Sequence, residues 1–253
     1  RSRVSFSLKI AHLSLIIRVL GLLPNRNYPS FNYDLLHIEQ HFLRLIMSKP
    51  LIFDLPTRLF HWCFAGFFAI SYIITNVTDD ESSLFPYHAL SGICLVFILT
   101  LRLIWGIGGT KYAKFSSYKL NPTDLITYFK SIMSGQGKRS FGRNPASSWA
   151  AITMMLMAFG LGLTGYLMAS GSGSSDIKEI HELLANGFLI VVLLHIAGIV
   201  LHTLRHKDPI ALSMITGRRK ATETDTKGIT NPKEGVGVAF IFMLLMLMTF
   251  LGL

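Results

Sequence analysis

Cysteine and acidic residues are scarce in this chain of 253 residues. Only Cys63 and Cys94 are present, each inside an apolar run, which excludes a disulfide framework. The sequence also lacks a Cys-x-x-Cys-His motif, so covalent attachment of haem is excluded. Asp and Glu number 14 against 24 Lys and Arg, which gives a formal net charge of +10.

Charged residues of both signs make up only 15% of the chain, while hydrophobic residues make up 51% and the mean hydropathy is +0.47. These values lie far from those of soluble domains and predict an integral membrane protein. The basic residues cluster in the links between apolar runs, where membrane topology accounts for them. The positive charge therefore does not indicate a nucleic-acid partner.

A membrane-spanning helix needs about 20 mostly apolar residues. Runs of that length occupy residues 59–78, 88–107, 149–168 and 183–204. A shorter run, 236–253, is equally apolar and predicts a fifth span. The expected fold is all-α, a transmembrane four-helix bundle with a fifth transmembrane helix at the C-terminus. Asn121 and Pro122 predict the start of a short amphipathic helix before residues 125–133.

The links between the runs predict the orientation in the membrane. Residues 102–145 hold eight basic residues and one acid, Asp124, so this link should be cytoplasmic. The opposite links, 76–87 and 169–180, hold acids and a single basic residue, Lys178. A multi-pass protein of the bacterial inner membrane with a cytoplasmic N-terminus is expected.

Three segments are expected along the chain. Residues 1–46 begin at Arg1 and precede Met47, a plausible natural start, so we interpret them as an extension outside the native core. The alternative is a cytoplasmic amphipathic arm. Residues 47–220 should form the four-helix membrane domain, and residues 221–253 a linker and the fifth span.

Nine histidines divide by position. Those in the N-terminal extension and His206, between Arg205 and Lys207, are expected at the surface. The extension holds His12, His37 and His41. The other five lie in or at the ends of the spans, namely His61, His88, His181, His195 and His202.

The spacing of the span histidines predicts two pairs at two depths. His181 and His195 are about 21 Å apart along one helix and within about 40° of one face. The topology places His88 level with His181 near the outer surface, and His61 level with His195 in the inner half. Two imidazoles on one iron suit an electron-carrying haem. We therefore predict two non-covalent b-type haems, held by these two pairs.

The intramembrane histidines also allow different roles. A lone histidine in a span is more often a packed polar residue or a proton relay than a metal ligand. A proton-coupled transporter or metal permease is the alternative function, although no inverted repeat supports it. A membrane anchor whose histidines only pack is a third hypothesis. Zinc is disfavoured, because no thiolate or carboxylate joins the histidines at a shared depth.

The assignment at the inner level leaves some residues open. His202 lies on the same face as His195, and depth alone could pair either with His61. Spacing favours His195, which leaves His202 near a haem propionate or a quinone, or simply packed. Arg58, Arg102 and Arg205 lie at inner membrane edges, and each is a candidate counter-ion for a haem propionate.

The order of several short motifs resembles one known family. They are Arg58-Leu-Phe-His61-Trp62, His88-Ala-Leu-Ser-Gly92, Arg102-Leu-Ile-Trp105-Gly106, Gly142-Arg-Asn-Pro145, His181-Glu-Leu-Leu-Ala-Asn with His195, and Met214-Ile-Thr-Gly-Arg218. Together they resemble the prokaryotic cytochrome b561 family, which groups with the cytochrome b subunits of nickel-iron hydrogenases.

The resemblance implies a four-helix bundle with two b-type haems on His61, His88, His181 and His195, and electron exchange with the quinone pool. The redox partner would be a hydrogenase, a periplasmic cytochrome c, or superoxide in a stand-alone quinone reductase. The chain departs from the family at Arg143, where a histidine is frequent, and in the extra run 236–253.

Overall fold

The computed structural model describes residues 49–79, 81–135, 142–220 and 228–252. Pro50–Leu253 forms one compact unit. The predictions for residues 1–46, including His12, His37 and His41, lie outside the described residues, as does the proposed start at Met47. The segment boundaries predicted from the sequence stay predictions.

The predicted all-α class is confirmed. The helices are α3 (Leu55–Val77), α4 (Phe85–Gly108), α5 (Pro122–Met133), α6 (Pro145–Ala169), α7 (Ser175–His206), α8 (Ile210–Thr216) and α9 (Glu234–Leu251). Five of them, α3, α4, α6, α7 and α9, are long and apolar enough to cross a membrane. Across the described ranges there is no strand, only an isolated antiparallel bridge between Leu51 and Arg218.

Polar caps set where the helices begin. The Asp54 carboxylate accepts a hydrogen bond from the Thr57 amide at the start of α3, and a proline follows in the first turn. Asn144 and Ser147 form a reciprocal capping box at the start of α6. Asn121 caps α5 by accepting from the Thr123 amide, as its sequence predicts. Such caps explain why several helices start before their apolar runs do.

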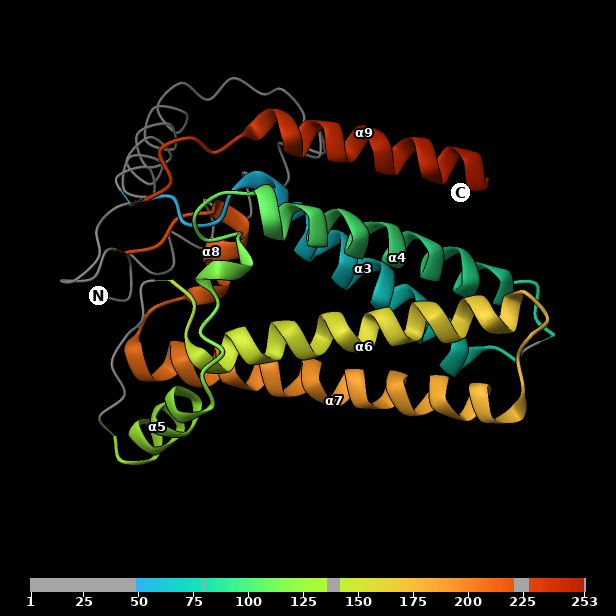
Figure 1. Ribbon diagram of the computed structural model, residues 1–253, viewed down its shortest axis with the longest axis horizontal. Coiled ribbons are helices and arrows are strands. Elements are labelled where there is room, and N and C mark those ends of the chain that lie inside the picture. Colours follow the sequence, from blue (N-terminus) through green and yellow to red (C-terminus); the bar gives the residue numbers. More distant parts are fainter. Residues whose placement is uncertain (1–48, 80, 136–141, 221–227, 253) are drawn as a thin grey trace, which may run out of the picture. The chain divides into compact units, whose positions relative to one another are not determined.

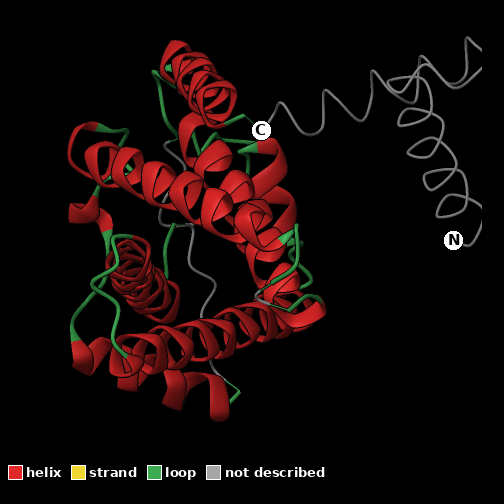
Figure 2. Ribbon diagram, turned by 90° about the vertical axis from the view of Figure 1, so that its right-hand side faces the viewer, coloured by secondary structure: helices red, strands yellow, loops and turns green. Residues whose placement is uncertain are grey.

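The bundle consists of two antiparallel hairpins, α3–α4 and α6–α7, which meet where α4 packs against α6 (Figure 1). We call the end with the turns at residues 81–84 and 170–174 the turn end, and the opposite end, which carries α5 and α8, the α5 end. The second view shows that helices joined by loops make up the described part of the chain (Figure 2).

A small apolar cluster fills the middle of the bundle. Phe188 of α7 is only 2% exposed and packs with buried Leu99 and Ala158. Its ring lies 4.6 Å from that of Phe68 and 6.0 Å from that of Phe64, measured between centroids. Phe188 therefore joins α7 to α3 by packing against Phe64 and Phe68.

The predicted fifth span is confirmed as α9. It packs against α3 and α4 through Phe240 and Leu244, which are 1% and 7% exposed. The Phe240 ring meets Phe60 of α3 edge to face, with centroids 4.7 Å apart. Gly237 lets the helices approach closely, because a Cβ there would lie 2.7 Å from Leu55 Cγ.

Candidate functional site

The site at the turn end is built around two facing imidazoles. His88, one turn into α4, and His181, near the start of α7, have ring centroids 6.2 Å apart and ring planes 77° apart. The structure thus brings together two residues that the sequence predicts to be level. Both rings are partly buried.

A threonine fixes the proton on the His181 ring. Thr164 Oγ1 donates to the Gly160 carbonyl at 2.8 Å and lies 2.8 Å from His181 Nδ1. Because its proton is already used, the hydroxyl acts as the acceptor for an Nδ1–H. The His181 Nε2 therefore carries a lone pair that can bind a metal.

His88 is held in the same way by α3. Its Nδ1 lies 2.9 Å from Ser71 Oγ and 3.1 Å from the Ser71 carbonyl oxygen. A carbonyl only accepts, so this geometry favours an Nδ1–H on His88. Both turn-end imidazoles are thus anchored through Nδ1, which leaves the two Nε2 atoms for a ligand.

The inner pair is less closely joined. The His61 ring meets its neighbour Trp62 edge to face at 5.2 Å between centroids, and no ring contact with His195 occurs among the described residues. His61 and His195 are still close enough to interact electrostatically, and Arg143 acts on both. The pairing of these two residues as ligands stays a prediction.

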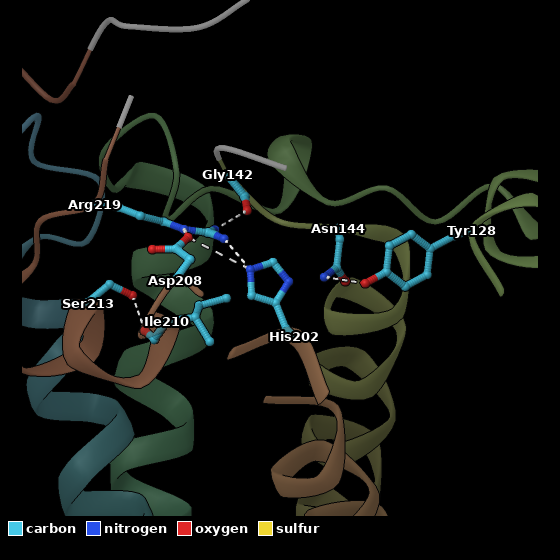
Figure 3. Close-up of polar contacts among 8 residues, drawn as sticks. All are labelled: Tyr128, Gly142, Asn144, His202, Asp208, Ile210, Ser213 and Arg219. Atoms are coloured by element: carbon cyan, nitrogen blue, oxygen red, sulfur yellow. Dashed lines mark hydrogen bonds and ion pairs between the residues drawn. The ribbon is translucent and has the colours of Figure 1, made fainter. Parts of the chain in front are cut away.

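His202 belongs to a buried polar cluster at the α5 end (Figure 3). Its Nε2 accepts a hydrogen bond from Arg219 Nη2 at 3.0 Å and lies 3.8 Å from Asp208 Oδ2. Arg219 and Asp208 also pair directly at 3.2 Å. These contacts occupy the Nε2 atom, so among the two roles that the sequence leaves open for His202, packing is the one its geometry supports.

His206, which the sequence predicts at the surface, is partly exposed. Its ring lies 4.6 Å from that of buried His202. One helical turn separates the two residues, so they share a face of α7.

The loop before α6 adds two partly buried polar residues, Arg143 and Asn144. Asn144 Nδ2 donates to the Tyr128 hydroxyl of α5 at 3.0 Å (Figure 3). Burial raises the pKa of the Tyr128 phenol, so the group stays neutral and can accept this bond. Burial lowers the pKa of the Arg143 guanidinium, which still remains charged because its ordinary value is very high.

The three arginines at the membrane edge have different surroundings. Arg58 Nη1 donates to the Ile215 carbonyl at the end of α8, at 2.5 Å. Arg205 Nη1 donates to the Ile132 carbonyl of α5 at 2.7 Å. Arg102 instead faces the loop after α4, where Nη2 donates to Tyr118 and Ala113.

Comparison with known proteins decides the family. The model of the prokaryotic cytochrome b561 family matches residues 52–217, about two thirds of the chain. The chain belongs to the prokaryotic cytochrome b561 family. It is therefore a multi-pass membrane b-type cytochrome that works in electron transfer with b-type haem. No curated protein and no solved structure was found to match the chain.

The turn-end geometry of this family member suits a haem iron. An imidazole nitrogen lies about 2 Å from a metal that it binds, and its ring centre about 1 Å farther. Two rings on opposite sides of one iron therefore have centres about 6 Å apart, and those of His88 and His181 are 6.2 Å apart. The described part of the cytochrome has no group of three or more His, Cys, Asp and Glu side chains that could hold a bare metal ion.

Glycines next to the histidines divide into two kinds. A Cβ on Gly92 or Gly198, one turn or less after His88 and His195, would meet no atom within 4 Å. Gly160, Gly162 and Gly187 instead lie under side chains of neighbouring helices, where a Cβ would come within 3 Å of another atom. The first two leave room beside the histidines, and the other three serve ordinary helix packing.

Several functional side chains of the cytochrome escaped the sequence prediction. Ser71 and Thr164 look like ordinary small residues of a span, and only the fold shows which histidine each one meets. Asp54 is fully buried and accepts from Trp105 Nε1 at 3.1 Å and Thr110 Oγ1 at 2.6 Å. Its position two residues before Pro56 is a helix-start signal that could have identified the cap.

Proposed function

We propose that this protein is a di-haem cytochrome b that passes electrons between the quinone pool and a redox partner. The observation that carries the proposal is the pair His88 and His181, with rings 6.2 Å apart and both Nδ1 atoms held by hydroxyl groups. The second haem would bind between His61 and His195, about 21 Å along α7 from the first. That separation fits inside an apolar core about 30 Å thick.

The protein's own residues would hold and tune the haems rather than make or break bonds. The haem supplies reversible one-electron chemistry, and two histidine ligands leave no open position on the iron. Ser71 and Thr164 would orient the turn-end imidazoles and increase their basicity by accepting from Nδ1–H. Phe64, Phe68 and Phe188 would keep water from the space between the two sites.

The orientation and the partners form part of the same proposal. The α5 end carries most of the basic residues, and the turn end carries Asp79, Glu81, Asp176 and Glu179 with one lysine. This asymmetry supports a bacterial inner-membrane protein with the α5 end in the cytoplasm. The turn-end haem would then face a periplasmic or membrane partner, such as a cytochrome c or a hydrogenase.

A visible spectrum with a haem count tests the proposal. Detergent-purified protein should show a reduced-minus-oxidised spectrum of b-type haem with two haems per chain. The variants His88→Ala and His181→Ala should each lose the same haem and keep the other. A colourless protein would overturn the di-haem assignment. So would a wild-type protein with a single haem that both His88→Ala and His181→Ala retain.

Electron exchange with quinone needs a test of its own. Reduced protein in liposomes should be oxidised by added quinone, and quinol should reduce the oxidised protein. If both haems are present but neither responds to quinone or quinol, the haem assignment stands and the quinone role is wrong.

A further inference from the structure

Arg102 lies near the end of α4, and its side chain contacts the loop that follows this helix. It follows His88 by fourteen residues on α4, as His195 follows His181 on α7. Fourteen residues correspond to about 21 Å and return to within about 40° of the same face. Arg102 therefore lies at the level of His195 and His61, on the side of α4 that carries His88.

One atom of the Arg102 guanidinium is buried without a partner. Nη2 donates to the Tyr118 hydroxyl at 2.7 Å and the Ala113 carbonyl at 3.0 Å, and the group lies 5.3 Å from the Phe115 ring centroid. Nη1 is buried and forms no hydrogen bond with any residue that the structure describes. Burying an N–H of a charged group without a hydrogen-bond acceptor costs free energy, and an added acceptor would offset that cost.

Arg143 lies over the ring of the same tyrosine. Its guanidinium carbon is 4.4 Å from the Tyr118 ring centroid, and its Nε donates to the Tyr112 carbonyl at 3.4 Å. Arg143 acts electrostatically on Arg102, and also on both His61 and His195. Both guanidinium groups therefore contact the Tyr118 side chain, at the level of His61 and His195.

The nearby acid does not supply the missing acceptor for Arg102. Asp54 interacts electrostatically with Arg143. The Asp54 carboxylate oxygens accept their hydrogen bonds from Thr57, Trp105 and Thr110 instead. Two like charges this close repel each other strongly where the dielectric constant is low. A carboxylate offsets that repulsion and suits the planar fork of a guanidinium.

We propose that Arg102 and Arg143, which both contact Tyr118, form a carboxylate-binding site that takes a propionate of the haem held by His61 and His195. The inference rests on the proposed function, and goes beyond it by assigning the counter-ions of one particular haem. Arg205 is not part of this site, because its hydrogen bond holds α5. Arg58 also has a buried nitrogen without a partner, Nε, but it lies against α8, where its Nη1 donates to Ile215, and no contact joins it to Tyr118.

Redox titration of charge variants tests the site. Arg102→Gln and Arg143→Gln should lower the midpoint potential of the haem at the α5 end, since an uncompensated propionate favours ferric iron. We expect at least a tenfold change in its reduction equilibrium, which is about 59 mV for one electron. Arg102→Lys and Arg143→Lys should retain most of the potential. Arg205→Gln is the matched control and should leave both potentials close to those of the wild type.

Loading the unaltered protein with haem dimethyl ester tests the same contact without any substitution. The ester lacks the negative charges, so the α5-end site should release it at least ten times faster than it releases haem. In the Arg102→Gln and Arg143→Gln variants the two cofactors should be released at similar rates. This double comparison isolates the interaction between arginine and carboxylate.

Two results would overturn the inference. One is a potential in the glutamine variants that matches the Arg205→Gln control. The other is equal retention of haem and its ester by the wild-type α5-end site. A wild-type protein that binds no haem, or only the haem at His88 and His181, would instead contradict the proposed function.

Discussion

Ser71 Oγ of α3 lies 2.9 Å from His88 Nδ1 of α4, and seventeen residues separate the two in sequence. Thr164 of α6 and His181 of α7 repeat this arrangement at 2.8 Å with the same separation. Each hairpin thus carries an imidazole on its second helix and a hydroxyl that orients it on the first. The two hairpins meet so that the imidazoles face each other.

Removing these hydroxyl groups should weaken the turn-end haem. In Thr164→Val, His181 loses the hydroxyl that accepts from its Nδ1–H, and losing the hydrogen-bond partner of a metal ligand typically costs about 10- to 100-fold in affinity. Haem retention against a haem-free globin measures the effect. Ser71→Ala should cost no more than this, because the Ser71 backbone carbonyl still accepts from His88. A Thr164→Val protein that retains haem as well as the wild type would contradict this tautomer assignment.

The angle between the turn-end rings predicts a spectroscopic signature. With ring planes 77° apart, the imidazoles of His88 and His181 would interact with different d orbitals of a haem iron bound between them, which would keep those orbitals nearly equal in energy. The oxidised haem should therefore give a strongly anisotropic low-spin EPR signal. His61→Ala protein, which should hold only this haem, allows the measurement. A signal typical of parallel ring planes would contradict the expected geometry.

His195 and His202 should respond differently to substitution. His195→Ala should lose the α5-end haem, because it removes a proposed ligand. His202→Ala should retain two haems per chain, since the His202 Nε2 already accepts from Arg219. Haem quantification by the pyridine haemochrome method gives the count for both variants. Loss of a haem in His202→Ala with retention in His195→Ala would reverse the assignment.

The buried pair of Asp208 and Arg219 should contribute to stability rather than to haem binding. Asp208→Asn removes the carboxylate that pairs with the Arg219 guanidinium at 3.2 Å, and breaking a buried pair costs about 3 kcal/mol or more. Thermal unfolding in detergent should show a lower Tm, with two haems still bound. Asp176→Asn, an exposed acid in the first turn of α7, is the control and should cost less than about 1 kcal/mol.

The docking of α9 should depend on Phe240. Phe240→Ala removes a ring that is 1% exposed between α3 and α4, and we expect a loss of about 2 kcal/mol. The value is below that of a soluble core because lipid replaces the lost contacts. Phe242, on the same helix but 64% exposed, offers the matched control Phe242→Ala. Proteolysis of α9 in detergent should distinguish the two variants, while haem content stays unchanged in both.

The sequence predicted the membrane helices well because apolar runs of about 20 residues are rare outside membrane spans. The ends were less accurate. The first span was expected from residue 59, yet α3 begins at Leu55, because Asp54 and Pro56 start the helix before its apolar run. The fourth was expected over 183–204, while α7 covers Ser175–His206, since the polar residues at both ends continue the helix.

That His88 and His181 lie close together could also be predicted, because depth follows from topology and helical rise. The network around His202 could not. It depends on the fold-back after α7, where the Gly217 carbonyl accepts from the amides of Ile52 and Phe53 and brings Arg219 toward the bundle. Gly217 has φ +75°, and its Cβ would lie 2.5 Å from the Phe53 carbonyl oxygen, so only glycine suits this turn. Such a long-range contact leaves no periodic signal in the sequence.

Phe188 lies seven residues from both His181 and His195, on nearly the same face of α7. With Phe64 and Phe68 it fills the halfway point with packed rings that offer no acid or base to relay a hydrogen ion. Under the proposed function, an electron that passes from one haem level to the other would therefore cross without a proton. Each turnover would then separate charge across the bilayer and change the membrane potential.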